Sequence, residues 1–144
     1  MTTIAQRQAA LVERFGKISD WEERYGEIIR LGRLLPEFPE DKRTELNKVK
    51  GCQSQVWMHA SLQDGNVVFV ADSDAAIVRG LIAILLELYS GQPPRAILEA
   101  PPSFIDELGL GSHLSQNRAN GLSAMLKQMK LYATAFQALA QRSV

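Results

Sequence analysis

The spacing of apolar residues along the chain predicts four helices. Residues 4–15 place their large apolar side chains on one helical face, and residues 21–35 repeat that spacing until Pro36. Residues 75–90 form a third, largely apolar stretch that ends in a Ser-Gly pair and two prolines, as a helix end often does. Residues 122–139 keep the helical period and predict a long last helix.

Polar residues in front of these stretches predict where the helices begin. Thr3 with Gln6 has the spacing of a capping box, in which two side chains satisfy the free backbone amides of the first turn. Ser19 with Glu22 repeats this spacing before the second helix. The Asp-Ser-Asp sequence at residues 72–74 is expected to cap the third helix, whose positive end favours acidic groups.

The middle of the chain predicts a β-hairpin. Residues 55–62 and 66–71 are strand-like and flank Asp64-Gly65, a dipeptide typical of two-residue hairpin turns. Residues 39–48 are mostly polar and are expected to form an exposed loop, whereas prolines and glycines in residues 95–114 predict only short turns. This layout predicts an α+β fold with helices packed on one face of a small antiparallel sheet.

Composition and charge narrow the functional classes. Of the 144 residues, 46% are hydrophobic and 22% are charged, which predicts a single globular domain over residues 1–144. Sixteen basic side chains balance sixteen acidic ones, so no basic field favours nucleic acid, and a protein or small molecule is the expected partner. The longest apolar run, residues 80–86, is too short to span a bilayer, and the first residues lack a signal-peptide pattern. A cytoplasmic location is therefore expected.

Cys52 is the only cysteine, so no disulfide can form within the chain. A single cysteine is often just a small buried apolar residue. Here, however, Gly51 precedes it and Gln53 and Ser54 follow it, which places it in a polar, turn-prone segment between two strand-like stretches. The freedom of Gly51 would let backbone amides converge on the sulfur, and such donors would favour the nucleophilic thiolate.

The absence of a second thiol excludes several chemistries. Thioredoxin-like exchange needs a resolving cysteine, and a cluster scaffold or zinc site normally uses several thiolates. His59 and His113 are the only histidines and make a poor ligand set with one cysteine, so no bound metal is expected. What remains is a thiol that receives a group and passes it on.

The segment Gly-Cys-Gln-Ser-Gln-Val-Trp at residues 51–57 resembles the active loop of the SufE family, the sulfur acceptors of cysteine desulfurases. Residues 21–25 and 31–37 resemble the family's N-terminal helices, and residues 72–81 resemble the start of its central helix. Residues 114–122 are similar to the start of its last helix. These matches occur in the family's order and span nearly the whole chain.

The resemblance implies a SufE/IscU-like fold with a sheet of about three strands. It implies that Cys52 accepts sulfur as a persulfide from a desulfurase of the SufS or CsdA type, stimulates that enzyme, and passes the sulfur to an iron–sulfur scaffold of the SufBCD type. The protein would then be a sulfurtransferase-like accessory protein that itself holds no cofactor, with PLP on the desulfurase. Asp74 and Arg118 match positions near the active loop or the partner-facing surface.

Two departures leave the identity of the desulfurase open. Asn117 stands where the family often has a small residue such as serine. Residues 104–110 look closer to the CsdE branch, whereas residues 51–57 look closer to SufE itself. The oligomeric state, including a homodimer, and the exposure of Cys52 at rest are open as well.

Other interpretations of the residues also stay open. For Asp74 the plain alternative is a helix cap, and for Arg118 it is a solvated residue in the first helical turn, where a cation opposes the helix dipole. Arg118 would otherwise pair with an acid such as Asp74 or lower the pKa of Cys52. For the protein as a whole, the alternatives are an adaptor with an inert cysteine, a hydrolase using Cys52 with His59 or His113, and a redox-sensing thiol.

Overall fold

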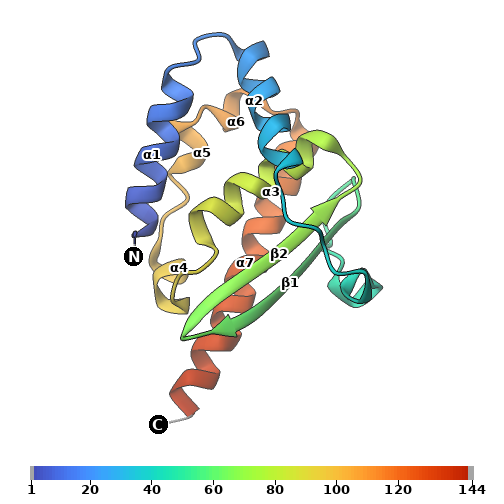
Figure 1. Ribbon diagram of the computed structural model, residues 1–144, viewed down its shortest axis with the longest axis vertical. Coiled ribbons are helices and arrows are strands. Elements are labelled where there is room, and N and C mark those ends of the chain that lie inside the picture. The colour runs from blue at the N-terminus through green and yellow to red at the C-terminus, as the bar shows by residue number, and fades with distance from the viewer. Residues whose placement is uncertain (1, 143–144) are drawn as a thin grey trace.

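The computed structural model describes residues 2–142 and joins a helical body to one β-hairpin (Figure 1). In chain order the elements are α1 (Ile4–Gly16), α2 (Trp21–Arg33), the 3-10 turns η1 (Glu40–Lys42) and η2 (Glu45–Asn47), β1 (Val56–Gln63), β2 (Asn66–Ser73), α3 (Ala76–Tyr89), α4 (Pro94–Glu99), α5 (Phe104–Glu107), α6 (Leu110–His113) and α7 (Gln116–Arg142). The four long helices and the hairpin agree with the sequence predictions.

The hairpin packs one face against the helices. β1 and β2 pair in antiparallel register from Val56 opposite Ser73 to Gln63 opposite Asn66, and both turn residues, Asp64 and Gly65, have positive φ. The inward side chains of both strands are buried, and the Tyr132 hydroxyl of α7 donates to a carbonyl of β1 at 3.2 Å. In Figure 1, α7 passes behind the hairpin and α3 lies beside it. The predicted α+β class, with helices on one sheet face, is confirmed.

The number of strands differs from the expected three. Among residues 2–142 the sheet has two strands, and an isolated bridge flanks it on each side. Lys48 pairs with Trp57 at one edge, and Val67 pairs with Gln92 at the other. Each flanking segment makes a single bridge to the sheet, so neither becomes a third strand.

The core depends on a close crossing of α2 and α3. Helix α3 is the most apolar helix, and most of its side chains are buried. A Cβ atom on Gly32 would lie 2.6 Å from the backbone nitrogen of Gly80, and one on Gly80 would lie 2.6 Å from the carbonyl carbon of Ile28. The two backbones therefore touch at these glycines, which fixes where α3 begins relative to α2.

Two of the three predicted helix caps are wrong in detail. The capping box of Thr3 and Gln6 is confirmed by reciprocal hydrogen bonds of 2.9 and 3.1 Å. Asp20 rather than Ser19 caps α2, because its carboxylate accepts from the backbone N–H of Glu22 at 3.0 Å. The N-cap of α3 is Ala75, which makes no side-chain capping bond, so the acidic cap expected at residues 72–74 is not formed.

The remaining segments carry short helical turns. Residues 94–113 form three short helices rather than turns alone, and the polar loop at 39–48 contains two 3-10 turns. Arg43 of this loop packs over the ring of Trp57 at 4.7 Å and forms an ion pair with Asp72 of β2 at 3.0 Å. This contact holds the loop against the outer face of the hairpin. Within residues 2–142, no helix is long and apolar enough to cross a membrane.

Candidate functional site

Cys52 lies in a short loop whose two ends are held in place. The backbone N–H of Val49 donates to the carbonyl of Val56 at 2.8 Å, which closes the segment between them. Gly51 has a φ of +91°, a conformation that other residues adopt only with strain. The loop can therefore present Cys52 in a turn while its base remains attached to the sheet.

The sulfur of Cys52 is half-buried against helix α7. Its Sγ–H group donates to the carbonyl oxygen of Gly121 at 3.7 Å. A Cβ atom on Gly121 would lie 3.8 Å from Sγ, so the absence of a side chain there leaves room beside the sulfur. Cys52 lines a hollow of about 350 Å³ whose other lining residues are Gln53, Ser54, Val78, Leu81, Ser115, Asn117, Arg118, Gly121, Leu122 and Met125.

The hollow combines an apolar floor with a polar rim. Val78 and Leu81 of α3 and Leu122 and Met125 of α7 are buried and apolar. Ser54 and other polar residues lie at the opening, from the loop and the start of α7. Such a site can hold a small uncharged or polarisable group out of water while leaving one side open.

Burial raises the pKa of the Cys52 thiol above its ordinary value. The expectation that backbone amides would converge on the sulfur and favour the thiolate is wrong for this state, because the sulfur's hydrogen bond among the described residues goes to a carbonyl. A carbonyl oxygen accepts a hydrogen bond only from the protonated thiol, and the partly apolar surroundings disfavour the charged thiolate. At rest Cys52 is therefore a protected thiol.

This state predicts the pH dependence of alkylation at Cys52. Because the pKa is raised, the thiolate fraction at a given pH is smaller in the folded protein than in the unfolded chain. The alkylation rate with iodoacetamide is expected to rise with pH, with a midpoint above that of the same chain in denaturant. Thiol labelling followed by intact mass at a series of pH values gives both midpoints. A midpoint below that of the unfolded chain would contradict the protected thiol.

Arg118 comes from the first turns of α7 and lines the same hollow as Cys52. Its backbone N–H donates to the Ser115 hydroxyl at 3.3 Å, and its side chain is exposed. Within residues 2–142 its guanidinium has no ion-pair partner. The suggested pairing with Asp74 is therefore not formed, and the charge of Arg118 remains available to a group entering the hollow.

Asp74 holds the base of the loop rather than a helix end. Its carboxylate accepts from the backbone N–H of Gln55 at 3.1 Å, and its own N–H donates back to the Gln55 carbonyl at 3.4 Å. It does not line the hollow with Cys52. Both the helix-cap interpretation and the pairing with Arg118 are wrong here, because the carboxylate is used to fix the start of β1.

Neither histidine lies in the hollow with the cysteine. His113 stacks on Trp21 with ring centroids 3.8 Å apart and places Nδ1 3.0 Å from the Gly109 carbonyl. His59 lies in β1. The structure thus offers Cys52 no histidine base, which removes the geometric support for a Cys-His hydrolase.

Gly121 and the apolar floor of the hollow were not among the predicted site residues. Gly121 had a detectable signal, because a glycine inside a helix costs about 1 kcal/mol relative to alanine and so suggests a close approach at that position. The floor residues had no such signal. They follow the ordinary apolar period of α3 and α7, and nothing in the pattern distinguishes them from other core positions.

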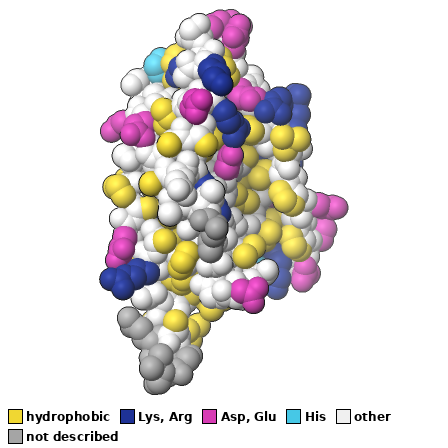
Figure 2. All heavy atoms as spheres, turned by 60° about the vertical axis from the view of Figure 1, so that its left-hand side comes forward, with side chains coloured by type: hydrophobic (Ala, Val, Ile, Leu, Met, Phe, Trp, Pro, Cys, Tyr) yellow, Lys and Arg dark blue, Asp and Glu magenta, His cyan; other side chains and the backbone are white. Residues whose placement is uncertain are grey.

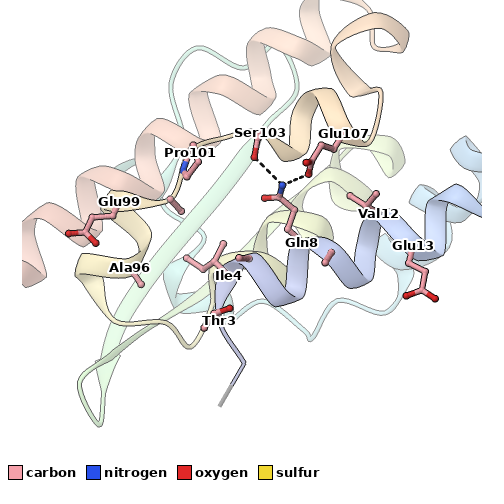
Figure 3. Close-up of a pocket in the computed structure, with 13 residues that line it drawn as sticks. Thr3, Ile4, Gln8, Val12, Glu13, Ala96, Glu99, Pro101, Ser103 and Glu107 are labelled. Atoms are coloured by element: carbon pink, nitrogen blue, oxygen red, sulfur yellow. Dashed lines mark hydrogen bonds between the residues drawn. The ribbon is translucent and has the colours of Figure 1, made fainter.

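A larger groove of about 730 Å³ lies between α1 and the α4–α5 segment (Figure 3). Gln8 reaches across it and donates to Ser103 at 3.0 Å and to Glu107, while Glu13 and Glu99 lie towards its two ends. Figure 2 shows the α1 side of the molecule, with hydrophobic side chains exposed across the middle of this face. The groove contains no thiol or histidine, so we place the chemistry in the smaller hollow.

Comparison with known proteins finds a matching family model and relatives that carry the same family name. A family model described as SufE, an Fe–S metabolism associated domain, matches residues 9–133. A SufE-like protein of Synechocystis is 40% identical over 135 residues, covering 94% of this chain and 85% of that protein. A SufE-like protein of Rhizobium etli is 47% identical over 126 residues, covering 83% and 84%. The solution structure of a hypothetical protein from Thermus thermophilus has a TM-score of 0.77 at 25% identity, covering 92% of this chain and 96% of that one.

Proposed function

The chain belongs to the SufE family, and we propose that within Fe–S metabolism it carries sulfur as a persulfide on Cys52. The donor is a PLP-dependent cysteine desulfurase, which the carrier stimulates by removing its bound sulfur. The acceptor is an iron–sulfur assembly scaffold. The observation that supports this proposal is the position of the sole thiol, which opens on a small hollow large enough for a second sulfur atom.

The hollow suits a persulfide because this group must be accessible to its partners and protected from other thiols. The outer sulfur must be reached by a donor and an acceptor, yet it is lost if any free thiol can attack it. Cys52 is half-buried, and its hollow has apolar walls on one side and an opening on the other. Residues Gly51, Gln53 and Ser54 belong to the same loop as the sulfur and would move with it.

The transfer step balances without an added oxidant. The Cys52 thiol gives its proton to solvent, and its sulfur attacks the outer sulfur of the donor persulfide, which keeps its own proton. A new S–S bond forms to Sγ while the donor S–S bond breaks, and the electron pair leaves on the donor cysteine as a thiolate. Delivery to the acceptor repeats the exchange with Cys52 as the leaving group.

Attack requires a change in the resting site, because the half-buried thiol has a raised pKa and therefore a smaller thiolate fraction. The loop ends are fixed by the Val49–Val56 and Asp74–Gln55 hydrogen bonds, so residues 50–54 can turn outward without disturbing the sheet. A partner that binds the outward state better shifts the population, and a shift from 1:99 to 99:1 needs about 5.5 kcal/mol of differential binding. Solvent exposure at the interface would also lower the pKa of the thiol toward its ordinary value.

Arg118 would hold the charged product. A persulfide is a stronger acid than a thiol and is largely anionic at neutral pH. When the loaded Cys52 returns to the hollow, the unpaired guanidinium of Arg118 is available to that anion. Asp74 would not contact the persulfide and would act by holding the base of the loop through its hydrogen bond to Gln55.

Intact-mass analysis tests the carrier function directly. The protein is incubated with L-cysteine and a purified cysteine desulfurase and then measured with and without reductant. We expect a mass gain of one sulfur atom that reductant reverses and that prior alkylation of Cys52 prevents. An unchanged mass, with desulfurase turnover still stimulated, would reject the carrier and favour the adaptor with an inert cysteine.

A further inference from the structure

A second hollow lies beside the Cys52 loop and has a different surface chemistry. It has a volume of about 550 Å³ and is lined by Leu46, Asn47, Lys48, Lys50, Gly51, Asn120, Ala124, Lys127, Gln128, Leu131 and Tyr132. Both leucines of this lining are unusually open to solvent: Leu46 is 92% exposed and Leu131 is 54% exposed. We call this surface the lysine–leucine patch.

The exposed leucines are not explained by the core. Leu46 lies on η2, a 3-10 turn with no buried residue, and is the most exposed large hydrophobic side chain among the described residues. Leu131 lies on the outer side of α7 across the same hollow. Leu46 contributes almost no buried surface to the fold and Leu131 only about half of its own, so both would bury further apolar surface under another protein.

The side chains that line the patch carry charge of one sign, and Glu45 beside it attracts Lys48 and, from farther away, Lys50. Three lysines line the hollow, and no aspartate or glutamate does. Lys48 pairs with Glu45 at 2.8 Å, but Lys50 and Lys127 have no ion-pair partner within residues 2–142. Because the whole chain has a formal net charge of zero, this local excess is a feature of the patch rather than of the protein.

The patch is continuous with the candidate site. Gly51 lines the patch, and the next residue, Cys52, lines the other hollow. The same change of side occurs on α7, where Asn120 faces the patch and Gly121 faces the sulfur. A protein seated on the patch would therefore contact the backbone that carries Cys52, and would do so beside the point where the sulfur must emerge.

We propose that the lysine–leucine patch is the docking surface for the protein that donates the sulfur. This inference rests on the proposed carrier function. The donor would present carboxylates to Lys50 and Lys127 and an apolar recess to Leu46. We assign the donor rather than the acceptor because the donor approaches with an anionic persulfide, which unpaired lysines next to Cys52 attract, and because donor binding must draw the empty thiol out of its hollow.

The test measures binding of a purified SufS-type cysteine desulfurase, separately from sulfur transfer. The variants are Lys50→Glu combined with Lys127→Glu, and Leu46→Ala alone. We expect the double charge reversal to weaken binding by about tenfold or more and to remove much of its salt dependence. Leu46→Ala is expected to weaken binding with the salt dependence retained, because the lost contact is apolar.

Matched controls separate the patch from general surface effects. Lys17→Glu makes the same charge change at the end of α1, and Leu62→Ala removes an exposed leucine, 42% accessible, near the hairpin turn. Both are expected to bind as the wild type does. Circular dichroism and thermal melting of every variant confirm that the fold is retained, which the exposure of the replaced side chains favours.

The possible outcomes distinguish the patch from the carrier function. If the double variant binds the desulfurase as the wild type does while Cys52 still gains sulfur, the docking proposal is overturned and the carrier function stands. If the double variant keeps its affinity for the desulfurase but loses delivery to the scaffold, the patch serves the acceptor and the proposal is also overturned. Weakened binding of the double charge reversal and of Leu46→Ala, with both controls unchanged and with Cys52 gaining sulfur in the wild type, supports it. The same binding result with no sulfur on wild-type Cys52 would overturn both the carrier function and the assignment of the patch to a sulfur donor.

Discussion

The Cys52→Ser variant is expected to bind the desulfurase and to leave its turnover at the level measured without any carrier. Serine has nearly the size of cysteine, so the loop and hollow should persist. Its oxygen cannot form the S–S bond that the transfer requires, and the chain has no other thiol to replace it. The loss of stimulation should therefore be complete rather than partial.

Desulfurase turnover with L-cysteine, measured as a function of carrier concentration, checks this expectation. Binding measured on the same variant shows whether the interface is intact. The Leu62→Ala protein serves as a control for handling, because its substitution lies at the other end of β1. Full stimulation by the Cys52→Ser variant would make the protein an adaptor. Retained binding without stimulation would identify Sγ of Cys52 as the atom that accepts the transferred sulfur.

Of all the substitutions proposed, Gly80→Ala is expected to cause the largest loss of stability. A Cβ atom at this position would lie 2.6 Å from the carbonyl carbon of Ile28 and closer still to its oxygen. The obstacle is backbone rather than a flexible side chain, so α2 and α3 must separate. Overpacking typically costs about 1–3 kcal/mol of the free energy of unfolding, and we expect the upper end here because backbone opposes the new Cβ. A loss of about 3 kcal/mol lowers Tm by roughly 10 °C in a chain of this size.

Urea unfolding and thermal melting measure this loss, and Gly26→Ala is the matched control on α2. A Cβ atom at Gly26 would meet nothing within 4 Å. Because alanine favours a helix over glycine, this control is expected to raise the free energy of unfolding by about 0.5–1 kcal/mol. Opposite signs for the two glycines would support the close crossing. A Gly80→Ala protein as stable as the wild type would contradict it.

The local pattern of the chain predicted most of its elements because that information lies in neighbouring residues. The helical period placed α1, α2, α3 and α7, and the Asp64-Gly65 turn placed the hairpin with its strands correct to about two residues. The errors occurred where two local choices compete. Ser19 and Asp20 both favour an N-cap, and only the geometry of the chain entering α2 selects Asp20.

The candidate site was predicted only in part. The residues around Cys52 indicated a turn with a reactive cysteine, and Gly51 does adopt a positive φ. Arg118 could be named from the family resemblance, and the structure places it in the hollow. The pKa direction was predicted wrongly, because it depends on what packs over the sulfur. That neighbour, Gly121, is sixty-nine residues away along the chain.

By itself, then, the sequence determined the elements, the α+β class and the presence of a single thiol in a turn, since each follows from spacing or composition. The tertiary structure decided that α7 covers the sulfur, that Asp74 fixes the loop base, and that Arg118, Lys50 and Lys127 keep their charges unpaired among the described residues. These facts depend on contacts between residues distant in the chain, which only packing of the helices around the hairpin brings together.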